Sequence, residues 1–399
     1  MNVLFLLGNL YPYSSANAEC VKNVSASLSE KKIDVHFLSF GEKNLILRDD
    51  NYHTVKAFRY LGNSLYRGEK NGLTRKMYLA CCNMFEPPFP LYSKCLKNEF
   101  YSMLKKLYAI YRFQKIISVI QPIEAALAVA DFKEDYPEIQ MIVYEVDSIT
   151  DDPIYDSGWR KLYKKKSLRI EKKIYDCADL VIHIDSHEQY FNDRYYDRWR
   201  NKFKISGLPM ISSKYSVDCI NNVTSIYEVA YTGSLSEKWR SPQYFYKLIK
   251  NISEIQLHVT FCSRGCDEML QKMQQESPEN ITARGYVGVE EVIKLYKSSH
   301  LLLSIGNEGT NILPSKIYQY ISSGLPIIHI ASNNDDVCIP ILNKYGNCVI
   351  INKQKTLYDN KRELLGFINS GLNLKRFDNI VNAFVENTPE YVGNMIISN

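Results

Sequence analysis

The chain has 399 residues, so two domains are the natural expectation. Its hydrophobic content of 45% suffices for ordinary cores, while a net charge of +5 is too modest to indicate nucleic-acid binding by itself. Ten cysteines fall far short of a disulfide scaffold, and Cys81, Cys82, Cys262 and Cys266 lack partners at zinc-like spacing. We therefore expect buried free thiols in a reducing compartment.

The first apolar run, residues 3–7, predicts a buried parallel strand rather than a secretory signal. No basic segment precedes the run, and it stops at Gly8. Gly8 is not followed by the spacing of a dinucleotide fingerprint, which argues against a dehydrogenase. No run approaches the length of a transmembrane helix, so we expect a cytoplasmic protein, or one bound peripherally to the inner face of a membrane.

The rest of the first half continues the alternation of strands and helices. A helix at 17–31 and a strand at 33–40 complete a βαβ beginning, which favours a doubly wound parallel sheet. The further elements expected are a helix at 92–118, strands at 125–130, 141–146 and 178–184, and a basic helix at 157–176. Together they predict a Rossmann-like domain over residues 1–207.

The second half repeats the pattern after a polar linker at 208–226. Strands are expected at 228–232, 257–262, 281–283, 300–305, 326–330 and 347–351, with helices between them. This predicts a second Rossmann-like domain over residues 227–374. The closing segment, residues 375–399, has helical spacing of its apolar residues.

The stretch from Leu313 to Ile328 is the most informative in the chain. Pro314 suits the first turn of a helix, and Gly324 suits its end. Lys316 would then lie in the first turn, where free N–H groups and the positive end of the helix dipole could hold a diphosphate with it. A solvated lysine in an ordinary loop–helix–strand unit fits the same residues.

This stretch resembles the nucleotide-sugar site of GT-B-fold glycosyltransferases, in the large retaining family with two glutamates eight positions apart. In that family a lysine contacts the donor diphosphate, and the second glutamate contacts the ribose. Lys316, which follows Pro314 and Ser315, matches that lysine. Gln319 and Asn311 stand where the glutamates are expected. An amide still bonds a ribose diol, without charge-assisted strength.

The resemblance places further residues at the donor site. Gly233 and Ser234 form the turn after the first strand of the second domain, where N–H groups face the diphosphate. The family's nearby cation would come from Lys238, Arg240 or Arg264, and the sequence leaves that choice open. The residues expected beside the nucleotide base are Tyr286 and Val287, although Tyr286 also fits a core position. Gly8 lies at the corresponding turn of the first domain.

Asp147 follows the strand 141–146 and is the best candidate for a carboxylate near the acceptor. Aspartates in such loops are also ordinary turn residues, so both interpretations stay open. His183, His187 and His329 show neither triad nor metal spacing, and we expect them to be structural. No Asp-x-Asp stands at a strand end, so we expect no metal site.

The expected architecture is therefore α/β and GT-B, with two Rossmann-like doubly wound domains facing across a cleft and the helix at 375–399 packing back on the first. The expected function is metal-independent hexosyl transfer, with retention, from a nucleoside diphosphate sugar, with UDP as the expected nucleotide. The acceptor would be a glycan or lipid-linked glycan in surface polysaccharide synthesis, and no cofactor is expected. The alternatives are a GT-B sugar-nucleotide epimerase, a non-catalytic GT-B binding module and, without a supporting motif, a nucleic-acid-binding protein.

Two basic stretches suggest a membrane partner. One carries Lys105 and Lys106, the other Lys164, Lys165 and Lys166, and tyrosines are interleaved with both. Basic helices with aromatic neighbours suit anionic headgroups, which would place the enzyme beside a lipid-linked acceptor. A solvated helix face is the alternative.

Overall fold

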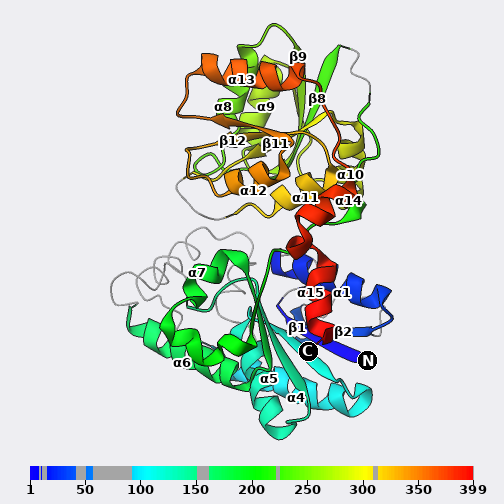
Figure 1. Cartoon of the computed structure of the whole chain (residues 1–399), viewed down its shortest axis with the longest axis vertical. Helices are drawn as coiled ribbons and strands as arrows, with labels where there is room; N and C mark the ends of the chain where they lie inside the picture. The colour runs from blue at the N-terminus through cyan, green and yellow to red at the C-terminus, as the bar shows by residue number, and fades with distance from the viewer. Residues whose placement is uncertain are drawn as a thin grey trace, which may run out of the picture. The chain divides into compact units, whose positions relative to one another are not determined.

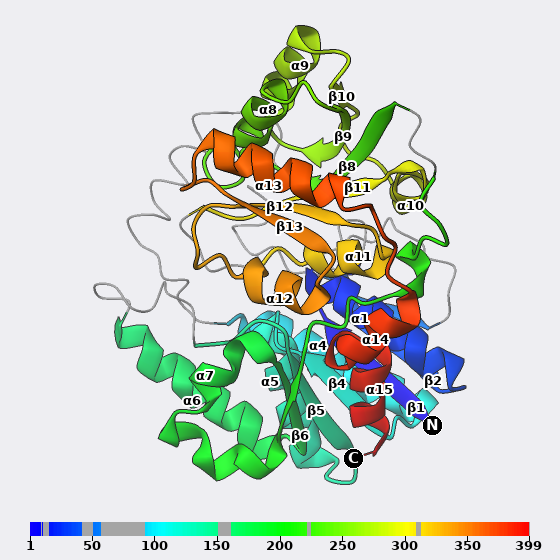
Figure 2. The ribbon, with the colours of Figure 1, turned by 45° about the horizontal axis from the view of Figure 1, so that its top comes forward.

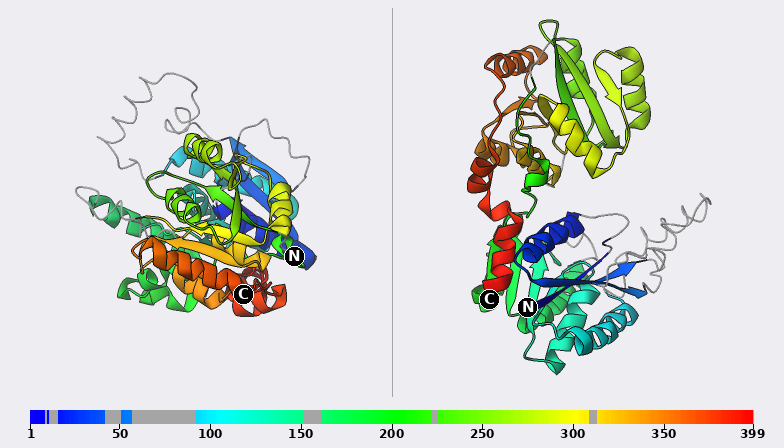
Figure 3. Two further views of the ribbon diagram at one scale, coloured as in Figure 1. Left: turned by 90° about the horizontal axis from the view of Figure 1, so that it is seen from above. Right: turned by 90° about the vertical axis from the view of Figure 1, so that its right-hand side faces the viewer.

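The structure is a computed structural model that describes residues 1–8, 10, 16–41, 51–56, 92–150, 161–221, 225–308 and 313–398. The chain divides into two compact units (Figure 1). The first unit is Met1–Pro209 with Pro389–Asn399, and the second is Met210–Thr388. Both ends of the chain thus belong to the first unit (Figure 3). Residues 210–221, expected in a linker, lie in the second unit, where Met210 and Tyr215 are buried.

The first unit is a parallel sheet in the order β3-β2-β1-β4-β5-β6-β7. Its elements are β1 (Asn2–Leu7), α1 (Ala16–Glu30), β2 (Asp34–Gly41), β3 (Tyr52–Lys56), α4 (Lys94–Tyr111), β4 (Lys115–Val119), α5 (Ile123–Asp135), β5 (Gln140–Glu145), α6 (Lys161–Cys177), β6 (Leu180–Ile184), α7 (Glu188–Phe191), β7 (Phe203–Ser206) and α15 (Pro389–Ser398). The order reverses between β1 and β4, so the expectation of a doubly wound sheet is confirmed.

Two elements of this unit differ from the sequence predictions. The expected helix over 92–118 ends at Tyr111, because Arg112 takes a left-handed conformation, and β4 follows. The expected strand over 125–130 is wrong: these residues lie in α5. Helix α5 contacts α4, α6, β4 and β5, so its side chains are buried nearly all round (Figure 1). A helix buried on all sides loses the 3.6-residue alternation that would identify it.

The C-terminal segment divides between the units. Helix α14 (Phe377–Ala383) belongs to the second unit, whereas α15 packs on α1 of the first. The approach is close at Gly393, where a Cβ would lie 3.5 Å from the side chains of Ser27 and Leu28. The buried Lys115 Nζ donates to the carbonyl of Ile396 at 2.7 Å. This ammonium joins β4 to the helix C-terminus, whose free carbonyls favour a cation.

The second unit is a parallel sheet in the order β10-β9-β8-β11-β12-β13. Its elements are β8 (Ile226–Ser234), α8 (Gln243–Lys250), β9 (Gln256–Arg264), α9 (Asp267–Glu276), β10 (Ile281–Ala283), α10 (Val289–Ser298), β11 (Leu301–Ile305), α11 (Lys316–Ser323), β12 (Ile327–Ala331), α12 (Cys338–Tyr345), β13 (Cys348–Asn352), α13 (Leu357–Asn369) and α14. Helices α8, α9 and α13 cover one face of this sheet, and α10, α11 and α12 the other (Figure 2).

Candidate functional site

The order of the second sheet reverses between β8 and β11, and ligands of such sheets bind beyond the strand ends at this point. Strand β8 pairs with β9 from Ile226 to Ser234. Its register with β11, in contrast, covers only Val229 and Ala230. The two central strands therefore part before β8 ends, and the residues that follow β8 lie at the opening.

Helix α11 places Lys316 at this opening. The helix begins at Lys316 and ends at Gly324, whose left-handed φ of +79° and close approach to the Lys375 carbonyl leave no room for a Cβ. The expected helix with Lys316 in its first turn is thus the one observed. Lys316 Nζ donates to Gln319 Oε1 at 2.7 Å, and Gln319 is buried.

Gly233 lies directly against the Lys316 side chain. Its φ is +146°, a conformation that disfavours any residue with a Cβ. A Cβ built there would lie 3.8 Å from Lys316 Cγ and 3.7 Å from the Tyr231 hydroxyl. The structure therefore brings together the lysine and the glycine turn, which are far apart in the sequence.

Among the three candidates for a second cation, Arg240 is the one whose guanidinium is hydrogen-bonded to a residue of this turn. Its guanidinium donates to Asn307 Oδ1 at 2.7 and 3.0 Å and to the Ser234 carbonyl at 3.3 Å. The backbone of Arg240 pairs with Ser236, which folds the segment back toward β8. Lys238 instead is exposed, with Nζ 4.3 Å from the centre of the Trp239 ring.

Arg264 and Tyr286 form a separate pair at the edge of the same sheet. The Arg264 guanidinium carbon lies 3.8 Å from the centre of the Tyr286 ring, a cation–π contact. The carbonyl of Arg264 accepts from Leu235 N at 2.8 Å, which joins the ends of β8 and β9. Tyr286 is 68% exposed, so it is not a core tyrosine, and Val287 is half-buried.

The remaining donor-site candidates lie before α11. Pro314 and Ser315 are half-exposed, and Ser315 is the N-cap residue although its side chain makes no capping hydrogen bond. Asn311 lies outside the described residues, so only one of the two amides is placed.

The candidates in the first unit gather at the equivalent edge of its sheet. Gly8 follows β1, and its N–H donates to the carbonyl of Gln121, just after β4, at 3.2 Å. Asp147 follows β5, is exposed, and accepts from Asn17 Nδ2 at 2.7 Å. Both residues thus lie at carboxyl ends of parallel strands, which is where chemistry is usually found in such sheets.

A buried pair of carboxylic acids near Asp147 was not anticipated from the sequence. Glu145 accepts from the Tyr175 hydroxyl at 2.6 Å, and Glu171 accepts from Tyr196 at 2.8 Å and from Thr150 at 3.1 Å. Burial, and next the charge of Glu171, raise the pKa of Glu145 well above its usual value. The buried site therefore favours the protonated form of Glu145. Only its position directly after apolar strand residues could have indicated burial.

Two of the three histidines singled out in the sequence, His183 and His329, are buried, and His187 is half-buried. Burial lowers the pKa of His183 to about 4. His329 Nδ1 contacts Ser304 Oγ at 3.0 Å, and Nε2 lies 3.3 Å from Asp336 Oδ2. With Cys338 these two form the one group of the described residues whose ligand atoms lie close enough for a metal ion. His329 Nε2 and Asp336 Oδ2 face each other directly, so the geometry does not require a metal.

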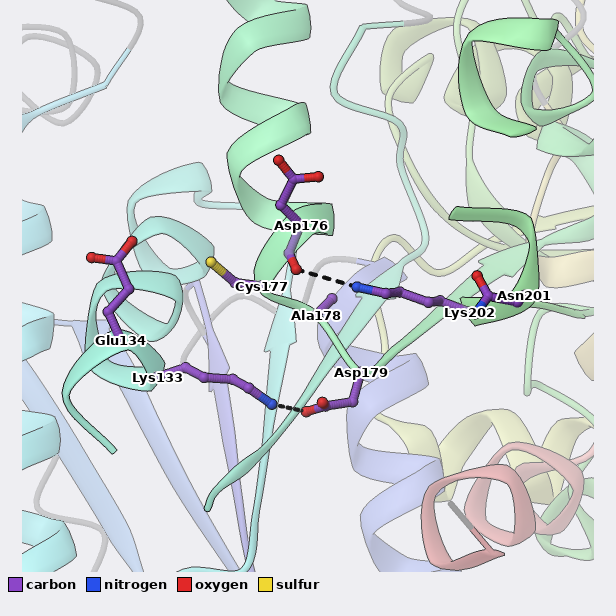
Figure 4. Close-up of a pocket in the computed structure, with 8 residues that line it drawn as sticks. All are labelled: Lys133, Glu134, Asp176, Cys177, Ala178, Asp179, Asn201 and Lys202. Carbon is purple, nitrogen blue, oxygen red and sulfur yellow. Dashed lines mark hydrogen bonds and ion pairs between the residues drawn. The ribbon is translucent and has the colours of Figure 1, made fainter. Parts of the chain in front are cut away.

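A pocket of about 480 Å³ lies at the opposite edge of the first sheet, where strands begin (Figure 4). Its lining residues are Lys133, Glu134, Asp176, Cys177, Ala178, Asp179, Asn201 and Lys202. Lys133 pairs with Asp179, and Lys202 donates to the carbonyls of Tyr175 and Asp176. Both lysines of the pocket are thus bonded to protein groups. None of the candidate site residues lines the pocket.

The described part of the chain contains no helix that is long and apolar enough to span a membrane. No protein-family model matches the chain, and no curated protein sequence matches it either.

Solved structures match over the whole chain. The lipopolysaccharide outer core galactosyltransferase WaaB is 13% identical, with a TM-score of 0.57 over 100% of this chain and 99% of that one. WaaG, a glycosyltransferase involved in lipopolysaccharide biosynthesis, is 9% identical, with a TM-score of 0.53 over 100% of both chains. The chain has the GT-B fold.

A GT-B neighbour of another activity matches equally well. The UDP-GlcNAc 2-epimerase from Neisseria meningitidis, bound to UDP-GlcNAc, is 10% identical, with a TM-score of 0.56 over 100% of this chain and 99% of that one. At such low identities the likeness establishes the fold alone, and the activity must be argued from the residues of the site.

Proposed function

We propose that this GT-B protein is a glycosyltransferase that binds a nucleoside diphosphate sugar in its second unit. The observation that carries the proposal is the pair of cationic side chains at the Gly233 turn. Lys316 packs against Gly233 itself, and Arg240 donates to the carbonyl of Ser234. A diphosphate at this opening would meet both cations and the N-terminus of α11.

Catalysis would consist of stabilising the diphosphate as it leaves. The bond between the anomeric carbon and the diphosphate oxygen breaks, negative charge grows on the diphosphate, and an acceptor oxygen bonds to the anomeric carbon. Lys316 and Arg240 are placed to stabilise that charge without a metal. The leaving phosphate can take the acceptor proton, which suits retention of configuration on the face that the diphosphate occupies.

The other donor contacts follow from the same placement. Gln319 would meet the ribose diol through its amide, and the exposed Tyr286 ring with Val287 would lie beside the base, with UDP as the expected nucleotide. Arg264 would act through Tyr286, since its guanidinium covers that ring. Pro314 and Ser315 shape the turn before Lys316.

The acceptor would be handled by the first unit. Asp147 and Gly8 lie at carboxyl ends of its strands, and the proposed acceptor is a glycan or a lipid-linked glycan of a surface polysaccharide. Helices α4 and α6 flank α5, whose Asp131 binds Lys97 and Lys173. Lys105, Lys106, Lys165 and Lys166 of the same two helices are exposed, which suits an anionic membrane surface on the cytoplasmic side.

A sugar-nucleotide epimerase is the second candidate, supported by an epimerase with the same fold. A binding module without activity is the third, because an amide stands at Gln319. A thermal-shift panel of UDP, GDP and their sugars would identify the nucleotide, and the same sugars would then be incubated with the protein. Slow release of nucleoside diphosphate supports a transferase, conversion to an isomeric nucleotide sugar supports an epimerase, and binding without turnover supports a module. No stabilisation by any nucleotide would contradict the proposal.

A further inference from the structure

The backbone of Thr232 is hydrogen-bonded by a side chain, at a position where a neighbouring strand would normally supply the partners. Thr232 is buried, and it lies beyond the β8–β11 register, which ends at Ala230. A buried N–H and C=O without partners would be costly. The Tyr320 hydroxyl accepts from Thr232 N at 2.9 Å and donates to Thr232 O at 2.7 Å, so one hydroxyl replaces both hydrogen bonds of the missing strand.

A second tyrosine holds the side chain of the same threonine. Thr232 Oγ1 lies 2.6 Å from the Tyr296 hydroxyl on α10, and the rings of Tyr296 and Tyr320 meet edge to face at 5.9 Å. Burial raises the pKa of Tyr320 to about 12, so its hydroxyl keeps the proton that it donates to the Thr232 carbonyl. Thr232 is therefore fixed to both helices immediately before the Gly233 turn.

Tyr320 and Lys316 are four residues apart on α11, so they lie on one face of the helix. Tyr320 bonds the residue before Gly233, and Lys316 packs against Gly233 itself. We propose that Tyr320 is a positioning residue, whose hydroxyl sets the distance between Lys316 and the Gly233 turn and so prepares the diphosphate site. This inference rests on the proposed function, since it assigns Tyr320 a part in the same site.

The test is a double-mutant cycle on UDP and GDP affinity, measured by calorimetry well below the melting temperature. In a chain that keeps Lys316, Tyr320→Phe should weaken nucleotide binding by about tenfold, since Lys316 is no longer held at the right distance from the Gly233 turn. In the Lys316→Ala background the same substitution should change affinity by less than about twofold. If Tyr320 had a purely structural role, Tyr320→Phe would lower the melting temperature, and the affinity losses of the two substitutions would be additive.

Tyr296→Phe is the matched control, because its hydroxyl bonds the Thr232 side chain and not the backbone. It should lower the melting temperature and leave nucleotide affinity within about twofold of wild type. Additive losses in the cycle, or unchanged affinity in a folded Tyr320→Phe variant, would overturn the inference. A wild type that binds neither nucleotide would overturn the proposed function itself, so the two failures are distinguishable.

Should Tyr320→Phe not fold, amide hydrogen exchange on the wild type tests the premise. The Thr232 amide should exchange as slowly as that of Ala230 inside β8, because the Tyr320 hydroxyl protects it. Exchange at the rate of an exposed turn amide would show that this hydrogen bond is not maintained and would overturn the inference.

Discussion

Lys316 Nζ donates its 2.7 Å hydrogen bond to the side-chain oxygen of Gln319, a neutral partner one turn along α11. An amide oxygen holds the ammonium in place without cancelling its charge, as a carboxylate would. At the proposed site, a diphosphate that approaches the turn would therefore meet a lysine whose hydrogen bond to Gln319 leaves its charge uncancelled. If the proposed diphosphate site is correct, the residue at position 319 sets how strongly Lys316 attracts an anion.

The first prediction concerns Lys316→Ala. The substitution should weaken binding of nucleoside diphosphate by about 1.5–3 kcal/mol and reduce turnover strongly, because one charge-assisted phosphate contact is lost. Calorimetry with UDP and GDP measures the affinity, and circular dichroism checks folding. Lys294→Ala, on the exposed side of α10, is the matched control and should behave as wild type. Unchanged affinity in Lys316→Ala would remove this lysine from the site.

Gln319→Glu separates the two contacts assigned to this position. The carboxylate should bond the ribose more strongly, so affinity for UDP should be preserved or improved. The same carboxylate would pair with Lys316, so affinity for pyrophosphate, which has no ribose, should fall by about threefold to tenfold. Both ligands can be titrated against one protein sample. A loss of UDP affinity above about tenfold with folding intact would contradict the ribose assignment.

Turnover is expected to continue in the presence of a chelator, since Lys316, Arg240 and the helix dipole neutralise the diphosphate. Activity would be measured before and after dialysis against EDTA, and again after adding magnesium or manganese. His329→Asn with Cys338→Ser tests whether the buried group holds a metal, with metal content as the readout. Complete loss of turnover that is restored by a divalent ion would point to a metal-dependent transferase.

Binding to vesicles with anionic lipids should depend on α6. Each lysine near such a surface contributes about 1 kcal/mol, so replacing Lys164, Lys165 and Lys166 by glutamate should abolish co-sedimentation at low salt. Wild-type binding should fall steeply as salt rises. Reversing the exposed Lys272, Lys294 and Lys297 of the second unit is the charge-matched comparison, with little expected effect. Equal binding of the wild type to neutral and anionic vesicles would contradict a membrane role and indicate that these lysines form a solvated helix face.

Glu145→Gln should change the pH dependence of stability. The folded-state pKa of Glu145 is raised, so its contribution to stability is full below the unfolded pKa and is lost as pH rises toward the folded one. The uncharged glutamine avoids that loss while still accepting from Tyr175. The variant should therefore gain melting temperature over wild type at pH 8 and little at pH 5. An equal difference in melting temperature between variant and wild type at pH 5 and at pH 8 would show that the folded protein does not favour the protonated form of Glu145.

The local sequence determined those features whose signals lie within one element. Pro314 before Lys316 and Gly324 after Ser323 mark both ends of α11, so the sequence placed Lys316 in a first turn correctly. Apolar runs bounded by polar turns likewise predicted β1, β2, β5 and β6 of the first unit and the strands of the second, whereas β3, β4 and β7 were missed. Such signals arise from backbone preferences and burial of neighbouring residues, which need no knowledge of distant contacts.

The tertiary structure decided what depends on distant partners. Helix α5 was mistaken for a strand because its neighbours bury it all round, and the sequence does not contain those neighbours. The proposal of Arg240 rather than Lys238 rests on its hydrogen bonds to Ser234 and to Asn307, which is 67 positions further along the chain. Tyr320 reaches Thr232 across 88 positions, to fill a gap that exists only because β8 and β11 part. Hydrogen bonds of this kind are set by the folded path of the backbone, so no local pattern records them.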